Sequence, residues 1–135
     1  FQTAVYIVYK QAYNTEPYVK IIHNRAHRSA LAQFRSGILP LKVETGRFTS
    51  IPLEYRLCIF CDTNDIEDET HFLFSCNFYT DLRTELFAHA HSAVPAFGHL
   101  CQERQLFALM GSNLVKKTAE YIYKAYDKRR KFLYR

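Results

Sequence analysis

The sequence has no tryptophan, and it has only four glycines, four prolines and four cysteines. With so few helix-breaking residues, continuous helical patterns dominate, and no internal repeat or low-complexity tract is present. There is no Gly-rich phosphate loop, and no serine has the context of a catalytic nucleophile. No apolar run approaches the roughly eighteen residues that a membrane span requires. We therefore expect a mainly α-helical segment with no membrane partner and no enzymatic activity of its own.

The composition is that of a folded domain. Apolar residues make up 48% of the 135 residues and aromatic residues 16%, so disorder is not expected and one core can form. The chain begins at Phe1 with no charged-then-apolar leader. We interpret it as a single domain (1–135) cut from a longer polyprotein, without a signal peptide. The expected location is intracellular, in the nucleus, the cytoplasm or both.

The net charge of +5 hides a segregation along the chain. Residues 1–57 carry eight Lys or Arg against three acids, whereas residues 58–113 carry two against eight. Residues 114–135 again carry eight against two. Basic flanks suggest a polyanionic partner, although solvation of helix faces by Lys and Arg explains the charge equally well.

Within the acidic middle, one block has the pattern of a metal site. Cys58, Cys61, His71 and Cys76 follow the spacing C-x2-C, nine residues, H-x4-C. Three thiolates and one imidazole suit a tetrahedral Zn²⁺, and because all four ligands are protein groups the ion would be structural. A redox C-x-x-C is the first alternative, but it needs a strand-to-helix turn. The second is that His71 and Cys76 are ordinary core residues.

The remaining cysteine and histidines have no ligand spacing. Cys101 is predicted to be a buried small hydrophobe. The histidines are predicted to lie on the surface or in packing contacts; they are His23, His27, His89, His91 and His99.

Before the metal block, the sequence predicts both helical segments and an irregular loop. Residues 2–13 are ambiguous, because their β-branched and aromatic content suggests a strand while Val5, Tyr9 and Ala12 fit one face of the favoured helix, and a break is expected at 14–17. Residues 19–36 read as a helix that ends at Gly37, with Ala30, Leu31, Phe34 and Ile38 on its inner face. Residues 41–57 read as an irregular loop, in which residues 44–48 form a turn that brings Arg47 and Arg56 near the metal.

Around His71 we expect a short helix over 69–75 with Asp68 as its N-cap. His71 and Cys76 are five residues apart, which on an unbroken helix places them roughly 140° from each other. The helix should therefore end, or tighten, just before Cys76. Asn77 is a good N-cap for the next helix.

Three further helices are predicted at 78–91, with Phe78, Leu82 and Leu86 inward, at 102–110 and at 114–132. The last is clearly amphipathic, with Val115, Ala119, Ile122, Tyr126 and Leu133 on one face. The opposite face is predicted to carry a basic stripe; its members are Lys117, Lys124, Lys128, Lys131 and Arg135. Three tyrosines interleaved with it, Tyr121, Tyr123 and Tyr134, are candidates for base stacking, although core or rim positions are the commoner use of such residues.

Several short motifs together resemble a known family. They are Arg28 with Leu31 and Phe34-Arg35; Glu44-Thr45-Gly46-Arg47-Phe48; Ile51-Pro52; Arg56-Leu57-Cys58-x2-Cys61; Glu67-Asp68-Glu69-x-His71-Phe72-Leu73-Phe74-x-Cys76; Tyr79-x3-Arg83; Phe107 to Asn113; and Ile122 to Ala125 with Arg129. Over roughly residues 25–132 the chain resembles the region that follows the reverse transcriptase domain in LINE-type (non-LTR) retrotransposon polyproteins. Two features differ. Asn77 stands where such sequences often have proline, and the gap from Cys61 to His71 is longer than in a retroviral zinc knuckle.

The resemblance implies a zinc-binding domain with ligands Cys58, Cys61, His71 and Cys76. It further implies a role in holding template RNA or target DNA for the upstream reverse transcriptase domain. The expected phosphate-contacting residues are Arg25, Arg28, Arg35, Arg47, Arg56, Lys117, Lys124, Lys128 and Lys131. The alternative hypothesis is a zinc-stabilised module that docks on the polymerase or another protein without touching nucleic acid. In both, the zinc block 58–76 fixes the basic flank 1–57 relative to the C-terminal helices in 77–135.

Overall fold

The computed structural model describes residues 21–134, and this part of the chain is mainly helical, as predicted. The α-helices are α3 (Arg25–Arg35), α4 (Lys42–Phe48), α5 (Thr80–Ala93), α6 (Gln102–Leu109) and α7 (Val115–Leu133). Short 3-10 turns lie at Leu53–Tyr55, Asn77–Tyr79 and Phe97–His99, and a π turn at His71–Ser75. In these residues, extended pairing is limited to one antiparallel bridge, between Leu57 and Ile66. The predictions for 2–13 and 14–17 lie outside the described residues.

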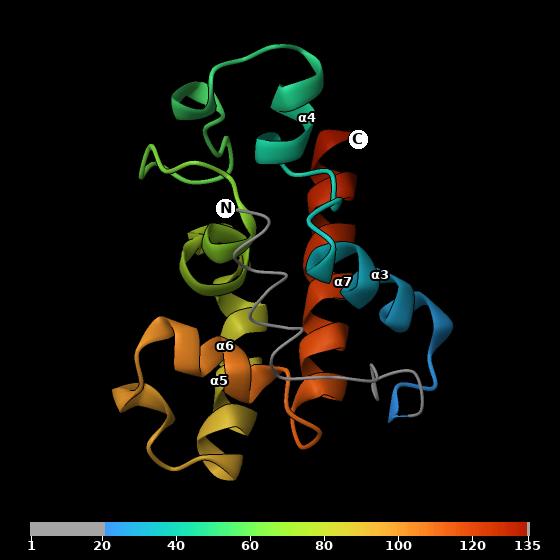
Figure 1. The fold of residues 1–135 in the computed structure, drawn as a ribbon, viewed down its shortest axis with the longest axis vertical. Coiled ribbons are helices and arrows are strands. Elements are labelled where there is room, and N and C mark those ends of the chain that lie inside the picture. The colour runs from blue at the N-terminus through green and yellow to red at the C-terminus, as the bar shows by residue number, and fades with distance from the viewer. Residues whose placement is uncertain (1–20, 135) are drawn as a thin grey trace.

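Helix α7 is the element on which the others pack. It runs through the centre of the molecule, with α3 against one side and α5 against another, and α4 lies near its C-terminal end (Figure 1). Val115, Ala119 and Ile122 are buried on it and Tyr126 is half-buried, so most of the predicted apolar face is correct. The prediction is wrong at its end, because Leu133 is 37% exposed.

Helix α3 is shorter than predicted. It begins at Arg25 because the side chain of Asn24 accepts a hydrogen bond from the His27 amide at 3.1 Å, which is an N-cap that the periodicity did not reveal. It ends as predicted at Gly37, whose φ of 71° is the left-handed conformation that glycine adopts without strain. Ile38 is 57% exposed, so its predicted place on the inner face is wrong.

The predicted turn at 44–48 is instead part of helix α4. Gly46 lies inside this helix because the side chain of Arg56 packs directly on it; a Cβ there would lie 2.6 Å from Arg56 Cγ. Arg56 donates to the carbonyls of Ile51 at 2.8 Å and Val43 at 3.0 Å. The glycine thus marks a close side-chain approach within a helix, where the sequence pattern suggested a loop.

Phe72 is the centre of the aromatic core. It is fully buried, and its ring contacts those of Tyr79, Tyr121 and Phe34, with centroids 4.9, 6.2 and 6.4 Å away. The Tyr121 hydroxyl donates to the Phe72 carbonyl at 2.7 Å. Because Tyr121 belongs to α7, these contacts attach the residues next to His71 directly to the central helix.

The chain after the metal block departs from expectation at single residues. Helix α5 begins at Thr80, with Tyr79 in the cap position and no side-chain cap, so Asn77 does not start it. Leu86 is buried, whereas Phe78 and Leu82 are half-buried. Cys101 is exposed, so its predicted burial is wrong. Among the described helices, none combines the length and apolarity needed to cross a membrane.

Candidate metal centre

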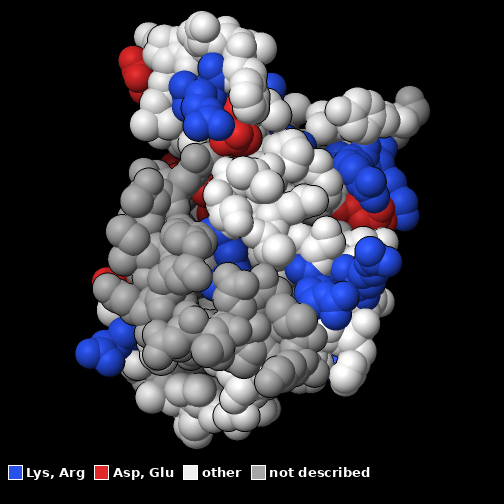
Figure 2. Space-filling view, turned by 45° about the vertical axis from the view of Figure 1, so that its right-hand side comes forward, with Lys and Arg blue, Asp and Glu red and all other residues white. Residues whose placement is uncertain are grey.

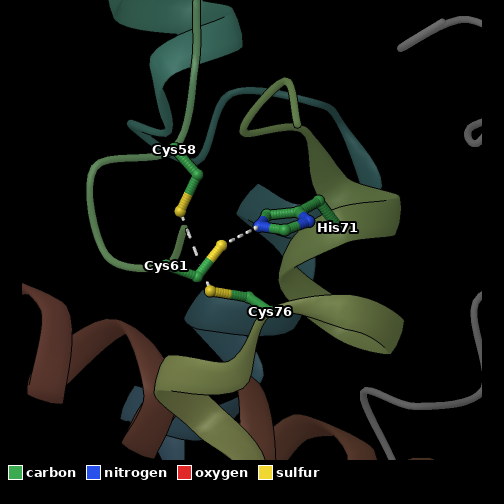
Figure 3. A group of neighbouring side chains, drawn as sticks. All are labelled: Cys58, Cys61, His71 and Cys76. Carbon is green, nitrogen blue, oxygen red and sulfur yellow. Dashed lines mark hydrogen bonds between the residues drawn. The ribbon is translucent and has the colours of Figure 1, made fainter. Parts of the chain in front are cut away.

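The four predicted ligands come together in space. The Sγ atoms of Cys58, Cys61 and Cys76 and a ring nitrogen of His71 all lie within 4.8 Å of one another. Figure 3 shows the side chains converging from three segments: the loop that carries Cys58 and Cys61, the turn that carries His71, and the start of the next turn at Cys76. Cys58 and Cys76 are buried and Cys61 is partly buried. The cluster can hold a metal ion.

Cys58 and Cys61 are presented by a loop that a small hairpin closes. The Leu57–Ile66 bridge is flanked by the bonds Cys58 N–H to Asp65 O at 2.9 Å and Glu67 N–H to Arg56 O at 3.0 Å. Within the loop, the Phe60 amide lies 3.4 Å from Cys58 Sγ and donates toward it. An amide directed at the sulfur stabilises the thiolate form that a metal requires.

His71 and Cys76 are brought to one side by a π turn. The Cys76 amide donates to the His71 carbonyl at 2.9 Å, which is an i to i+5 bond, and Cys76 itself is extended with ψ of 124°. The prediction that the helix ends before Cys76 is confirmed. The other expected possibility, a tighter turn, is wrong, because the turn is wider than an α-helical one. The extra residue in a π turn returns the i+5 position to the face of the first residue. Asp68 caps this turn as predicted, since its Oδ1 accepts from the His71 amide at 2.9 Å.

Two of the separations between ligand atoms agree with tetrahedral coordination. Ligands at the usual zinc distances would place two sulfurs about 3.8 Å apart and a sulfur and a nitrogen about 3.6 Å apart. Cys58 Sγ and Cys76 Sγ are 3.7 Å apart, and Cys61 Sγ and His71 Nε2 are 3.4 Å apart. A disulfide needs about 2.05 Å, so the cysteines are free thiols arranged around a common centre.

The same proximity shifts the protonation of the cluster. Hydrogen bonding to Cys76, reinforced by burial, raises the pKa of Cys58 to about 12, and the same contact lowers the pKa of Cys76. The neighbouring sulfur of Cys58 raises the pKa of His71 to about 9, against the opposing effect of burial. Without a metal the group therefore retains protons that an ion must displace, so metal affinity falls as pH falls.

A second layer of side chains holds the ligand-bearing backbone. Arg83 of α5 donates from Nε to the Leu73 carbonyl at 3.0 Å and from a terminal nitrogen to the Cys76 carbonyl at 2.8 Å. Beyond the buried Nδ1 of His71, the Asp65 carboxylate lies 3.8 Å away. A carboxylate on the far side of a ligating histidine is a common orienting feature of metal sites.

The strongest connection between the metal block and the rest of the fold is a buried ion pair. Arg129 of α7 makes two hydrogen bonds to Glu67, at 2.9 and 2.8 Å, and the two side chains are 6% and 0% exposed. Glu67 also accepts from the Lys42 amide at 2.7 Å. From the sequence alone, the acids of 62–69 are explained by loop solvation and helix capping, and this interpretation is wrong for Glu67. No local pattern could have revealed a partner 62 positions away.

The hollow beside the metal cluster is acidic. It has a volume of about 630 Å³ and is lined by His71, three carboxylates (Glu54, Asp65 and Asp68) and uncharged residues. Among the described residues that line it there is no Lys or Arg. A polyanion would be repelled here, so this surface does not favour phosphate binding.

The basic residues of the N-terminal flank are mostly engaged within the fold. Arg35 is 3% exposed, so it does not belong to a basic surface, and Arg56 is held by backbone carbonyls. Arg28 is half-buried beside the Ile22 carbonyl at 3.4 Å, and Arg47 pairs with Glu44 at 2.8 Å. Of the five arginines predicted here, Arg25 alone is exposed and makes no side-chain hydrogen bond or ion pair with another described residue.

The lysines of the predicted basic stripe on α7 are more exposed than the arginines of the N-terminal flank, but two of them pair with acidic residues on the same helix. Lys124 pairs with Glu120 at 2.7 Å, and Lys131, 77% exposed, pairs with Asp127 at 2.9 Å. Lys117 is half-buried, and Lys128 is exposed with its Nζ 2.6 Å from the Phe78 carbonyl. Figure 2 shows Lys and Arg in separate groups over one face, some beside acidic atoms. Arg135 lies outside the described residues.

The three tyrosines proposed for stacking are placed differently. Tyr121 is 3% exposed and holds the Phe72 carbonyl, so it cannot stack on a base. Tyr123 is half-buried with its ring 4.9 Å from that of His27. Tyr134 is 81% exposed.

Comparison of the chain with protein-family models, with curated proteins and with solved structures found no match.

Proposed function

We propose that the cluster binds one structural Zn²⁺. The support is the donor set, three sulfurs and one imidazole nitrogen, together with separations of 3.7 and 3.4 Å that fit a tetrahedral ion. Cys58, Cys61, His71 and Cys76 would supply all four ligands, which leaves no position for a substrate. When bound, the ion would cross-link the hairpin loop to the turn at His71–Ser75.

We further propose that this metal-stabilised domain binds nucleic acid as an accessory to a LINE-type reverse transcriptase. Its role would be to position template RNA or target DNA. The observation that carries the proposal is the position of α7: the buried pair of Arg129 and Glu67 fixes it to the metal block, while Lys124, Lys128 and Lys131 remain at the surface. The motif resemblance over residues 25–132 supplies the polymerase context.

The experiment is a plot of affinity for RNA and for DNA against salt concentration. Phosphate contacts release counterions, so the logarithm of affinity should fall steeply and linearly with the logarithm of salt. Reversing the charges of Lys117, Lys124 and Lys128 together should weaken binding and flatten the slope. Tight binding with little salt dependence, or no effect of the reversal, would contradict the proposal.

One observation favours docking on a protein as a second function. The segment that joins α4 to the metal loop exposes large apolar side chains: Phe48 at 75%, Tyr55 at 68%, Ile59 at 55% and Leu53 at 47%. These four residues lie within twelve positions of the chain, and exposed apolar residues that form a patch are typical of interaction surfaces. Replacing Tyr55 and Ile59 by Ser should abolish binding to the polymerase domain, if this is the docking surface, while leaving affinity for nucleic acid unchanged.

A further inference from the structure

At the C-terminal end of α7, two aromatic rings and two lysines line an open pocket. Its volume is about 500 Å³, and its described lining residues are Phe78, Lys128, Lys131 and Phe132. None of these four is acidic, in contrast to the hollow beside the metal cluster. The volume is within the range of pockets that hold small ligands of nucleotide size.

The aromatic wall of this pocket is built on the metal loop. Phe60, between Cys58 and Cys61, stacks on Phe78 with ring centroids 4.8 Å apart. Phe132 meets both rings edge-on, at 5.3 Å from Phe60 and 5.4 Å from Phe78. Since Phe132 packs against the other two rings and still exposes 41% of its surface, it is held in place while part of it faces solvent.

The two lysines supply positive charge beside the rings, and Lys128 lies over the face of Phe78. Lys128 Nζ lies 4.4 Å from the Phe78 centroid and donates to the Phe78 carbonyl, which uses one of its three donors. Lys131 is exposed on the next turn, paired with Asp127. An aromatic surface flanked by ammonium groups matches a nucleotide, because a base can stack on the ring and its phosphate can meet the cations.

We propose that this pocket binds an unpaired base of a single-stranded nucleic acid, with Phe132 as the stacking surface and Lys128 and Lys131 as phosphate contacts. The inference rests on the proposed nucleic-acid function and specifies its site. A duplex keeps its bases paired and stacked on each other, so it would meet only the lysines.

The test uses the full metal-loaded chain and single-stranded DNA and RNA oligonucleotides of about ten nucleotides, within the usual site size for single-strand binders. Each carries the fluorescent base 2-aminopurine, whose emission is quenched by stacking. A blunt duplex of the same length is the comparison ligand. The variants are Phe132→Leu, which keeps apolar volume but removes the aromatic face, and Phe132→Tyr, which keeps that face. Lys131→Gln tests the phosphate contact.

The expected result is that Phe132→Leu weakens single-strand binding about tenfold and removes the quenching, with no change for the duplex. Phe132→Tyr should behave like wild type. Lys131→Gln should lower the magnitude of the salt slope by about 0.7 on single strands. The matched controls Phe107→Leu and Arg104→Gln, exposed residues on α6, should change none of these quantities.

Three results would overturn the inference. If wild type binds with a steep salt slope and Phe132→Leu binds and quenches equally well, the bases stack elsewhere while the proposed function stands. If Phe132→Leu weakens single-strand and duplex binding equally, the ring does not contact bases. If wild type binds neither ligand even at low salt, the proposed function itself fails, and this pocket with it.

Discussion

The two basic flanks of this protein use their charge in different ways. In the described part of the N-terminal flank, Arg28 and Arg56 are directed at backbone carbonyls and Arg35 is buried. On α7, lysines at 124, 128 and 131 stay at the surface. The two flanks have the same number of Lys and Arg residues in the sequence, but their described residues do not expose the same amount of positive charge. Arg28, Arg35 and Arg56 belong to the fold, whereas the three lysines of α7 lie where a polyanion can reach them.

The largest expected effect acts on both flanks at once, through the zinc ion that we propose joins them. Cys58→Ser should unfold the middle of the domain, because structural zinc contributes on the order of 10 kcal/mol to the folding of small modules. Far-UV circular dichroism and thermal melting, with and without a chelator, measure this. Cys101→Ser is the matched control, since that thiol is exposed and outside the cluster. A wild-type melting temperature in Cys58→Ser would show that the flanks are held without the metal.

The second effect tests whether the role of a basic residue depends on its burial or on the flank to which it belongs. Arg129 belongs to the C-terminal flank but is buried against Glu67. Arg129→Met leaves that carboxylate without its partner, so it should lower the free energy of unfolding by about 3–5 kcal/mol. Urea denaturation gives this value. Arg130→Met, next in sequence but exposed, should change stability little. Similar losses for both variants would contradict the distinction.

The third effect concerns the N-terminal flank. Arg56→Met removes the donors to the Ile51 and Val43 carbonyls, and we expect a loss of about 1–3 kcal/mol in the free energy of unfolding. Affinity for nucleic acid should not change at a temperature where the variant is folded. Arg25→Met, exposed in the same flank, should preserve stability. If Arg56→Met instead reduces affinity for nucleic acid without any loss of stability, the N-terminal flank contacts nucleic acid in addition to stabilising the fold.

The smallest effect extends the comparison to the acidic middle. Burial, with smaller contributions from Asp68 and Glu44, raises the pKa of Glu69 from 4.5 to about 7. The folded state therefore holds this proton more tightly than the unfolded state, so stability falls as pH rises through that window and stays lower above it. Glu69→Gln should remove this loss of stability. Its free energy of unfolding should exceed that of wild type by about 2 kcal/mol or less at about pH 8 and equal it at about pH 4.

Urea unfolding of both proteins, metal-loaded, at the two pH values measures this difference. The contribution of the metal ligands is common to both proteins and cancels in the comparison. A constant difference between wild type and Glu69→Gln at all pH values would show that Glu69 does not titrate in this range.

The sequence predicted the features that depend on local spacing. The four metal ligands lie within nineteen residues, and the packing face of α7 repeats with the helical period, so both follow from positions along the chain. The N-cap Asp68 is equally local.

What the sequence could not predict depends on tertiary partners. Glu67 and Arg129 pair across 62 positions, and Gly46 is required by a side chain from another segment. Tyr121 has the sequence context of a surface aromatic residue on a basic helix, yet its hydroxyl donates to the Phe72 carbonyl in the core. Cys101 is small and apolar but lies at the exposed start of α6.

The central claim is that one metal ion holds the two flanks together, and elemental analysis of the purified protein tests it most directly. We predict one zinc ion per chain, retained through dialysis and lost in Cys58→Ser but not in Cys101→Ser. A folded wild-type protein that contains no zinc, and gains no stability when zinc is added, would contradict the account.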